Sequence, residues 1–426
     1  MRAVQAVGAP GDSPHLVGTG VAALRGVRLP SGGLGDVVVA EGHVTDGTQW
    51  TAGGADLDAA GWRVLPAAAE PHAHLDKALT APRIDPGAGN DLVDAISQWR
   101  TMLPGIDAAD IGARALAAVG RYLAHGITVI RSHVDVPLDG DRFRGVDALV
   151  ALRERLRGTV ELQVCLLAGS EADDGIVAEA VARGVDVIGG CPHLAPDPRH
   201  EITRMLDVAE RHGLPVDLHA DEQTDVGLPD AGFDLVEMAR QVLSRGLAQR
   251  VTASHCVRLG MLDPARLAPI LELTAEAGIG IVTLPITNLY LQGRGIPGVP
   301  RGLAPLRAIL DAGIPLAAGA DNLRDPFNPA GRADPFETTS LLMTAGHLRA
   351  AEALHAVTTG ARAVLGCEPA GVAPGQRADL VLVPDVDPGD LLASAVDARI
   401  VLAGGRVVAE TRAACSLDLP VHEVIT

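Results

Sequence analysis

The stretch Pro71-His72-Ala73-His74-Leu75-Asp76-Lys77 follows the apolar run Trp62–Ala69 and places two histidines one residue apart. In a β-strand, residues i and i+2 point to the same face, so His72 and His74 could both reach one ion. Neutral imidazole is the commonest nitrogen ligand of zinc in proteins, and it also binds iron. The alternative is a pair of surface histidines at a strand end, and the rest of the chain bears on that choice.

Short β-branched runs alternate with amphipathic helical stretches in the middle of the chain, a pattern typical of a parallel sheet built from βα units. In one such unit, the helical stretch 201–212 precedes Gly213, which stands where a C-terminal cap belongs. We expect eight strands of this kind, near residues 63–69, 128–134, 160–167, 185–190, 215–219, 251–255, 279–285 and 315–320. Eight units over roughly 300 residues predict an α/β fold, a (β/α)8 TIM-type barrel.

The two ends of the chain have a different pattern from the middle. Residues 21–44 and 378–408 are rich in Val, Leu and Gly and lack helical periodicity. We expect the segments 1–66 and 374–426 to meet as a small β-domain beside a barrel domain of residues 67–373. Two separate capping hairpins are the alternative interpretation of the same segments.

Composition and charge narrow the possible partners. The chain of 426 residues carries 35 basic and 53 acidic residues, a formal net charge of −18, without a long block of either sign. Nucleic acid binding requires a basic face, so we expect no nucleic acid partner. The N-terminus lacks the layout of a signal peptide and no apolar run reaches about 18 residues, so we expect no membrane attachment. Five scattered cysteines without C-x-x-C spacing indicate free thiols and a cytoplasmic location.

Further polar side chains fall at the carboxyl ends of the expected strands, where the active sites of such barrels lie. His219 follows the fifth strand, His255 ends the sixth and Asp321 follows the eighth. Any one of them could be a packed polar residue, but together with His72 and His74 they form a set that is hard to obtain by chance. We therefore expect a metal site at this end of the barrel.

Several segments of the sequence carry a resemblance to a known family. They are Glu70–Asp76 (EPHAHLD), Arg131–Asp135 (RSHVD), Pro192-His193, Asp217–Glu222 (DLHADE), Val251–His255 (VTASH), Asn288–Arg294, Asp321–Pro326 and Pro374–Leu380. Together they resemble the amidohydrolase superfamily, and within it the cytosine-deaminase-like branch, over residues 20–410. The resemblance implies a metal-dependent barrel hydrolase that acts on C–N bonds other than peptide bonds.

The resemblance also implies the ligands of the metal. One divalent ion, Zn²⁺ or Fe²⁺, would be held by His72, His74, His219 and Asp321. A divalent ion with an open coordination position lowers the pKa of bound water from about 16 to about 7. Superfamily members with two metals commonly bridge them with a carboxylated lysine at the end of the fourth strand. The only lysine of this chain, Lys77, lies just after the first strand, so we expect a single ion.

Catalytic and supporting roles follow from the same resemblance. Asp321 would accept a proton from the attacking water, and Glu222 would protonate a ring nitrogen and then the leaving amine. Burial is expected to raise the pKa of the Glu222 carboxyl. His255 would hydrogen-bond the attacking oxygen or the developing oxyanion. His133 and Asp135 would orient the metal histidines from behind.

Residues around the expected site bear on the substrate. Members that deaminate cytosine carry a glutamine after the third strand, whereas this chain has Leu166–Ser170 there, so we expect a ring other than cytosine. The text from Asp321 to Asp325 resembles the member that removes isopropylamine from an N-alkylated triazine. Candidate substrate contacts are His193, Gln292, Arg294, Asn322, Arg324 and Phe327, the last as a stacking wall.

The sequence thus predicts a metal-dependent aminohydrolase that deaminates a small pyrimidine-like or triazine-like heterocycle. Hydrolysis of an N-alkylamino group or of a cyclic amide bond in the same site is the second possibility. A binding protein on an inherited barrel would have lost metal-binding or acid/base residues, and all six expected positions are filled. The number of subunits is left open, a homo-oligomer included.

Overall fold

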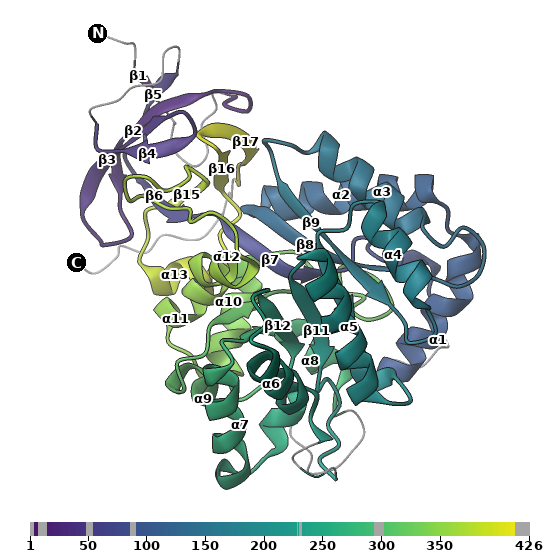
Figure 1. Ribbon diagram of the computed structural model, residues 1–426. Helices are drawn as coiled ribbons and strands as arrows, with labels where there is room; N and C mark the ends of the chain where they lie inside the picture. Colours follow the sequence, from purple (N-terminus) through teal and green to yellow (C-terminus); the bar gives the residue numbers. More distant parts are fainter. Residues whose placement is uncertain are drawn as a thin grey trace.

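The computed structural model describes residues 4–6, 15–47, 54–85, 91–227, 229, 232–293 and 302–413, the first three as backbone only. Figure 1 shows a large barrel ringed by helices and a smaller sheet, in which purple strands from the start of the chain lie beside yellow strands from its end. The barrel sheet has eight parallel strands and the smaller sheet is mixed. The architecture is therefore the predicted (β/α)8 TIM-type barrel with an additional small sheet.

The barrel strands are hydrogen-bonded in the order in which they occur along the chain. They are β7 Ala68–Ala73, β8 Ile127–Asp135, β9 Glu161–Ala168, β10 Val187–Gly190, β11 Val216–Ala220, β12 Val251–His255, β13 Gly280–Thr283 and β14 Leu316–Ala318.

The first predicted strand, 63–69, is divided between the two sheets. Trp62–Pro66 forms β6, which pairs with β15 of the small sheet, and only the part from Ala68 onward belongs to the barrel. The backbone N–H of Ala67 donates to Asp379 O at 3.0 Å, whereas that of Ala68 donates to Gly126 O at 2.9 Å. The chain thus changes hydrogen-bonding partners within two residues, and no local sequence pattern reports that change.

The barrel closes where the chain after β14 meets β7. An isolated parallel bridge pairs Asp321 with Ala73. Beside it, the backbone N–H of Ala320 donates to the buried Glu70 carboxylate at 2.9 Å. A side chain at Gly319 would clash with that carboxylate, so the glycine gives it room. Closure is therefore made at the carboxyl ends of the strands, where the predicted site lies.

Helices cover the outside of the barrel (Figure 1). Helix α5, Pro198–His212, buries Ile202, Met205, Leu206 and Ala209 and ends at Gly213, whose φ of 68° confirms the predicted cap. The other helices are α1 Leu92–Met102, α2 Ala108–Ala124, α3 Arg144–Arg155, α4 Asp174–Ala182, α6 Asp234–Arg245, α7 Pro264–Glu276, α8 Pro285–Leu291, α9 Leu306–Asp311, α10 Pro335–Thr344, α11 Ala350–Val357, α12 Thr359–Leu365 and α13 Pro388–Ala393.

The small sheet joins both ends of the chain. β6 pairs antiparallel with β15, and residues of both ends share one apolar core, with Trp62, Val64, Leu380 and Leu382 among them. Two separate hairpins are thereby excluded, while the exact domain limits stay a prediction. The strands are β1 Val4–Ala6, β2 Val21–Arg28, β3 Leu34–Ala40, β4 His43–Thr45, β5 Ala55–Asp58, β6 Trp62–Pro66, β15 Leu380–Pro384, β16 Arg399–Ala403 and β17 Arg406–Thr411.

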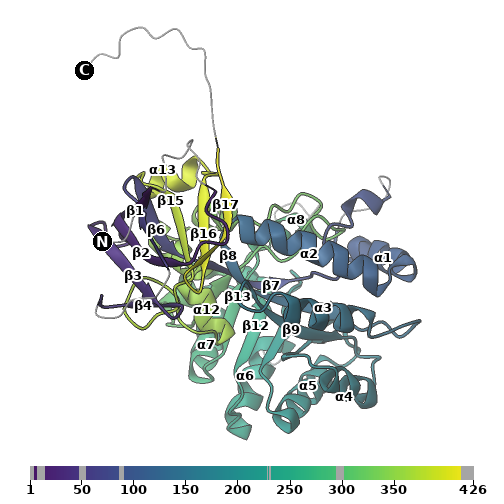
Figure 2. The same ribbon diagram turned by 90° about the horizontal axis from the view of Figure 1, so that it is seen from above.

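One buried arginine connects the small sheet to the barrel helices. Arg399 on β16 donates to both carboxylate oxygens of Asp334, at 2.9 and 2.8 Å, and to His125 O at 2.8 Å. Asp334 is the N-cap of α10, and His125 is the C-cap of α2. Figure 2 shows β16 and β17 lying beside α2 when the molecule is seen from above. The small sheet is therefore anchored to the barrel by a fully buried ion pair.

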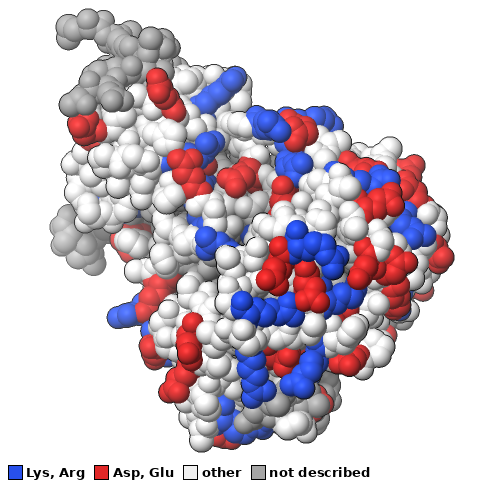
Figure 3. Space-filling view, viewed as in Figure 1, with Lys and Arg blue, Asp and Glu red and all other residues white. Residues whose placement is uncertain are grey.

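Acidic and basic side chains are interspersed on the face seen in Figure 3. Within the described ranges, no helix is both long and apolar enough to cross a bilayer. Cys165, Cys191, Cys256 and Cys367 are free thiols, while Cys415 lies outside the described residues.

Candidate active site

The carboxyl ends of the strands bring the predicted histidines and Asp321 together. His72 lies on β7, with His74 just after it, His219 lies on β11 and His255 ends β12. The Nε2 atoms of His72 and His219 face each other at 3.0 Å, and His74 Nε2 lies 3.3 Å from Asp321 Oδ1. All five side chains are buried. Residues more than 200 positions apart in the chain therefore form one polar cluster.

The chemistry of the cluster fits a cation. Burial, followed by the charge of neighbouring groups, lowers the pKa of His72, His74 and His219 well below the usual histidine value, so their rings are neutral and can act as ligands. The buried Asp321 Oδ1 has no hydrogen-bond partner within the described part of the chain. One ligand atom each from His72, His74 and Asp321 lies within 4.8 Å of the others, and so does a second group of His72, His133 and His219. These residues could hold a divalent metal ion.

A hydrogen-bonded relay behind His72 was not predicted. His72 Nδ1 donates to Ser254 Oγ at 2.9 Å, and this hydroxyl donates to Asp217 Oδ1 at 2.7 Å. Arg131 Nη1 donates to the other oxygen of Asp217 at 2.8 Å, so the buried carboxylate is charge-compensated. A proton on Nδ1 leaves the Nε2 lone pair of His72 free toward the cluster. One feature of the sequence could have indicated the relay. Asp217 stands two residues before His219 and therefore lies on the same face of the strand.

His133 lies against the cluster. Its ring stacks on that of His72 with the centroids 3.9 Å apart, and its Nε2 lies 3.7 Å from Asp217 Oδ2. The side chain thus touches both His72 and the carboxylate that supports His72 through Ser254. Asp135, for which the same role is predicted, lines a cavity and accepts from Lys77, which lies 3.3 Å from His74 Nδ1.

Glu222 lies between two histidines. Its Oε2 is 3.4 Å from His193 Nε2, and its Oε1 is 3.8 Å from His255 Nδ1. Burial acts to raise the pKa of Glu222, but His255 and His193 more than offset it and lower the pKa below the usual glutamate value. The expectation of a raised pKa is therefore wrong for this arrangement. It failed because the two rings come from β12 and from the segment after β10, which the sequence does not place beside Glu222.

His255 presents a proton on one side of its ring. Asn288 Nδ2 on α8 lies 2.9 Å from His255 Nδ1 and donates to it when the ring is neutral, and the ring proton then lies on Nε2. This Nε2 is buried and has no partner among the described residues, and His255 lines the cavity beside the cluster. The arrangement can offer a hydrogen bond to a bound molecule. Asn288 was not predicted as a site residue.

The backbone at the strand ends is strained. Asp221, His255 and Asp321 have positive φ angles of 50°, 73° and 67°. Non-glycine residues in this region cost about 1–3 kcal/mol each and persist where the surroundings hold them, which is common at functional sites. The Asp221 carboxylate, for example, accepts the backbone N–H groups of Asp234 and Leu235 at 3.1 and 2.9 Å, which fixes the turn before Glu222.

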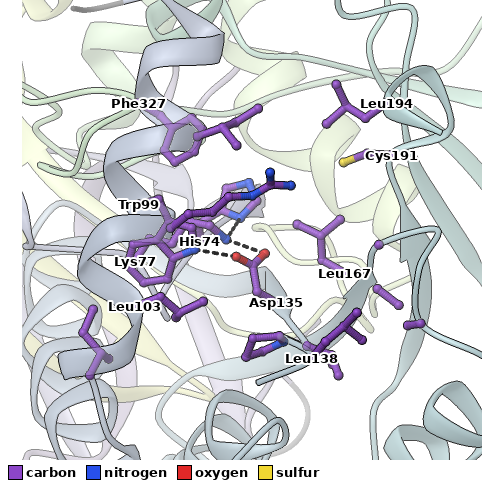
Figure 4. Close-up of a pocket in the computed structure, with 18 of the residues that line it drawn as sticks. His74, Lys77, Trp99, Leu103, Asp135, Leu138, Leu167, Cys191, Leu194 and Phe327 are labelled. Carbon is purple, nitrogen blue, oxygen red and sulfur yellow. Dashed lines mark hydrogen bonds and ion pairs between the residues drawn. The ribbon is translucent and has the colours of Figure 1, made fainter. Parts of the chain in front are cut away.

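A cavity of about 830 Å³ opens beside the cluster, and His74, His219, Glu222, His255 and Asp321 line it. Of the predicted substrate contacts, Asn322 and Phe327 also line it. In Figure 4, Phe327 lies at one side of the cavity, with Lys77 and Asp135 at another.

The other predicted contacts are placed differently. His193 is directed at Glu222, the side chain of Arg324 is exposed, and neither of them nor Gln292 is among the described residues that line the cavity. Arg294 lies outside the described residues. Arg324, the positively charged residue that the sequence offered for substrate binding, therefore does not line the cavity.

Known proteins resemble this chain in sequence and in fold. The sequence profile of the amidohydrolase family matches residues 101–409. The chain is 32% identical over 388 residues to a pterin deaminase from Rhizobium rhizogenes, covering 88% of this chain and 87% of that protein. Two solved structures are similar: 5-methylcytosine deaminase from Klebsiella pneumoniae (TM-score 0.81, 25% identity, 95% and 99% of the chains covered) and N-isopropylammelide isopropylaminohydrolase from Burkholderia multivorans (TM-score 0.78, 29% identity, 93% and 99%). The chain belongs to the amidohydrolase family, a family of metal-dependent hydrolases that act on C–N bonds.

Proposed function

We propose that this enzyme hydrolytically deaminates a small nitrogen heterocycle, replacing an exocyclic amine by oxygen and releasing ammonia. The observation that carries the proposal is the position of Glu222, a buried carboxylate on the wall of the same cavity as the His/Asp cluster. The pterin deaminase and the 5-methylcytosine deaminase support it, since both are named for the removal of an amine from a ring. The absent glutamine after the third strand favours a ring other than cytosine.

We assign a single divalent ion, Zn²⁺ or Fe²⁺, to His72, His74, His219 and Asp321. When bound, such an ion acts as a Lewis acid that brings the pKa of a water molecule near neutrality. The neutral rings of the three histidines and the unpaired Asp321 Oδ1 support this assignment. We assign His133 a supporting role, since its ring stacks on that of His72 and its Nε2 lies 3.7 Å from Asp217 Oδ2.

Glu222 moves the protons of the reaction. Because His255 and His193 lower its pKa, the carboxylate is ionised before turnover and can take a proton from the attacking water. It then gives that proton to a ring nitrogen and, in the second half of the reaction, takes the proton of the newly added hydroxyl group and gives it to the leaving amine. Asp321 is the second candidate for the first of these steps.

His255 stabilises the negative charge that develops on the oxygen bonded to the attacked carbon. Its Nε2–H has no protein partner in the described structure and can donate to the oxygen that becomes anionic. A donor that is already oriented, here by Asn288, needs no rearrangement during the reaction and is therefore effective.

A second candidate function is removal of an N-alkylamine in the same site, as the name of the N-isopropylammelide isopropylaminohydrolase indicates for that relative. One observation favours it: the cavity is large for a single ring, and Leu92, Ile96, Leu103 and Leu138 give it apolar walls. Hydrolysis of a cyclic amide bond would need the same catalytic groups and would yield a ring-opened acid.

Ammonia release from the metal-loaded protein tests these candidates. The panel comprises amino-pyrimidines, amino-triazines, pterins and small cyclic amides, with Glu222→Gln as the blank. Ammonia from at least one ring, lost in the variant, supports deamination. Alkylamine or a ring-opened acid as the only product would favour the second candidate function. The absence of any product from every ring would overturn the proposal.

Three further proposals concern the whole protein. We infer the domain division into residues 1–66 with 374–426 and residues 67–373, which the separate apolar core of the small sheet supports. The free thiols support a reducing, cytoplasmic location. The expected partner is a small heterocycle. A homo-oligomer is one candidate for the assembly, and light scattering measures the number of subunits.

A further inference from the structure

Asp135 at the end of β8 lines the cavity, with its side chain 23% exposed (Figure 4). Its Oδ1 accepts from Lys77 Nζ at 2.8 Å, and its Oδ2 accepts from Trp99 Nε1 at 2.6 Å. A carboxylate has acceptor sites for about four hydrogen bonds, so these two leave capacity on both oxygens. The residue is therefore an acceptor that faces the space where a substrate would lie.

Lys77, the only lysine of the chain, holds Asp135 next to the cluster of histidines and Asp321. This residue is buried, with only 3% of its surface exposed. Its ammonium lies 2.8 Å from Asp135 Oδ1, 3.3 Å from Asp76 Oδ2 and 3.3 Å from His74 Nδ1. The ammonium thus donates to the carboxylates of Asp135 and Asp76 and lies against the His74 ring. Its effect is to fix the Asp135 carboxylate one side chain away from His74.

The surroundings of Asp135 strengthen any hydrogen bond that it makes. Trp99, Leu103, Leu138 and Leu167 line the same part of the cavity, as Figure 4 shows. A hydrogen bond among apolar side chains is stronger than one in bulk water. Trp99 and Lys77 also fix the carboxylate in advance, so binding loses little side-chain freedom.

We propose that Asp135 is a specificity-determining residue, which accepts a hydrogen bond from an N–H group of the ring other than the amine that leaves. The inference rests on the proposed function, in which the cavity binds a nitrogen heterocycle. It names the substrate class: rings that carry a second amine or a ring N–H on the edge away from the reacting carbon. A ring without this donor would leave a partly buried carboxylate unpaired, and it would bind more weakly.

The test compares two triazines of nearly the same shape, a diamino-methyl-triazine and an amino-dimethyl-triazine, which differ in one amine against one methyl group. Equilibrium binding is measured by calorimetry in the Glu222→Gln background, where turnover is blocked, and metal content is measured in every sample. We expect the diamino ring to bind roughly tenfold more tightly or better, the size of one hydrogen bond to a charged group. Asp135→Asn should remove this preference, because the amide presents N–H on one side.

Asp139→Asn is the matched control, since Asp139 lines the same cavity from an exposed loop position four residues further on. This variant makes the same change of charge and should keep the preference. The inference is overturned if Asp135→Asn keeps the preference, or if this variant loses metal and binds both rings more weakly by the same factor. It is also overturned if neither triazine binds. Failure of the proposed function has a different result: the wild-type protein would release no ammonia from any ring, whether or not the preference is present.

Discussion

Ser254 Oγ lies 2.9 Å from His72 Nδ1 and 2.7 Å from Asp217 Oδ1, so one buried hydroxyl joins a candidate ligand to a carboxylate that Arg131 compensates. A metal-binding histidine whose second nitrogen is held in this way presents the first in a single tautomer and orientation. The relay connects β12, β11 and β8 behind the cluster.

Loss of this relay should weaken metal binding without loss of the fold. For Ser254→Ala we expect metal affinity to fall about 10–100-fold, because His72 then loses the acceptor for its Nδ1 proton. The measurement is a competition titration against a chelator. Thr252→Ala on the same strand is the control, since its buried hydroxyl has no described partner. Equal affinities for the Ser254 variant and the wild type would show that the relay does not orient His72.

Removal of the metal should abolish activity and lower thermal stability. Chelator treatment takes away the group that the buried cluster is built to hold, and a ligand that binds only the folded state stabilises that state. Ammonia release and the melting temperature are both expected to recover on addition of one equivalent of Zn²⁺ or Fe²⁺ per chain. A requirement for two equivalents would contradict the single-ion assignment, and full activity of the metal-free protein would contradict the cluster as a catalytic site.

Glu222→Gln should reduce kcat by about 10²–10⁴-fold while metal content stays the same, because the proposed role of this side chain is to move protons and not to bind the ion. Glu171→Gln is the control, because Glu171 lines the same cavity from an exposed position. A comparable loss in the control, or a loss of metal in the Glu222 variant, would remove the proton-transfer role.

The pH dependence of kcat/KM provides a separate test of the charge on Glu222. His255 and His193 lower the pKa of this carboxyl, and the ionised form starts the reaction. Activity is therefore lost only as the pH falls through that lowered pKa, so the acid limb should lie below about 4.3, the usual value for glutamate. This limb is measured with a ring that does not itself titrate in the range. An acid limb well above that value would mean that the carboxyl starts the reaction protonated.

Arg399→Ala should destabilise the protein by about 3–5 kcal/mol, because it leaves the buried Asp334 carboxylate without its partner. Urea unfolding measures the loss. Arg349→Ala, which breaks the exposed pair with Glu352, is expected to change the unfolding midpoint little. Similar midpoints for the two variants would show that the Arg399 pair does not anchor the small sheet.

Patterns that repeat along the chain were enough to predict much of the fold. The spacing of apolar residues before Gly213 correctly predicted the end of α5, because helix periodicity and capping are local properties. The change from the small sheet to the barrel at Ala67 was missed, because it depends on hydrogen bonds to Asp379 and Gly126, which are distant in sequence. Local patterns do not contain that information.

The sequence by itself determined which groups are present at the carboxyl ends of the strands: the His-X-His of His72 and His74, then His219, His255 and Asp321. A parallel barrel brings those ends together, so their residue types already indicated a metal site. Only the tertiary structure decided how the neighbouring side chains act. His255 and His193 oppose the effect of burial on the pKa of Glu222, and Asp135 lines the cavity beside Lys77. These outcomes depend on distances between side chains from different strands, because electrostatic and hydrogen-bonding energies change steeply over a few ångströms.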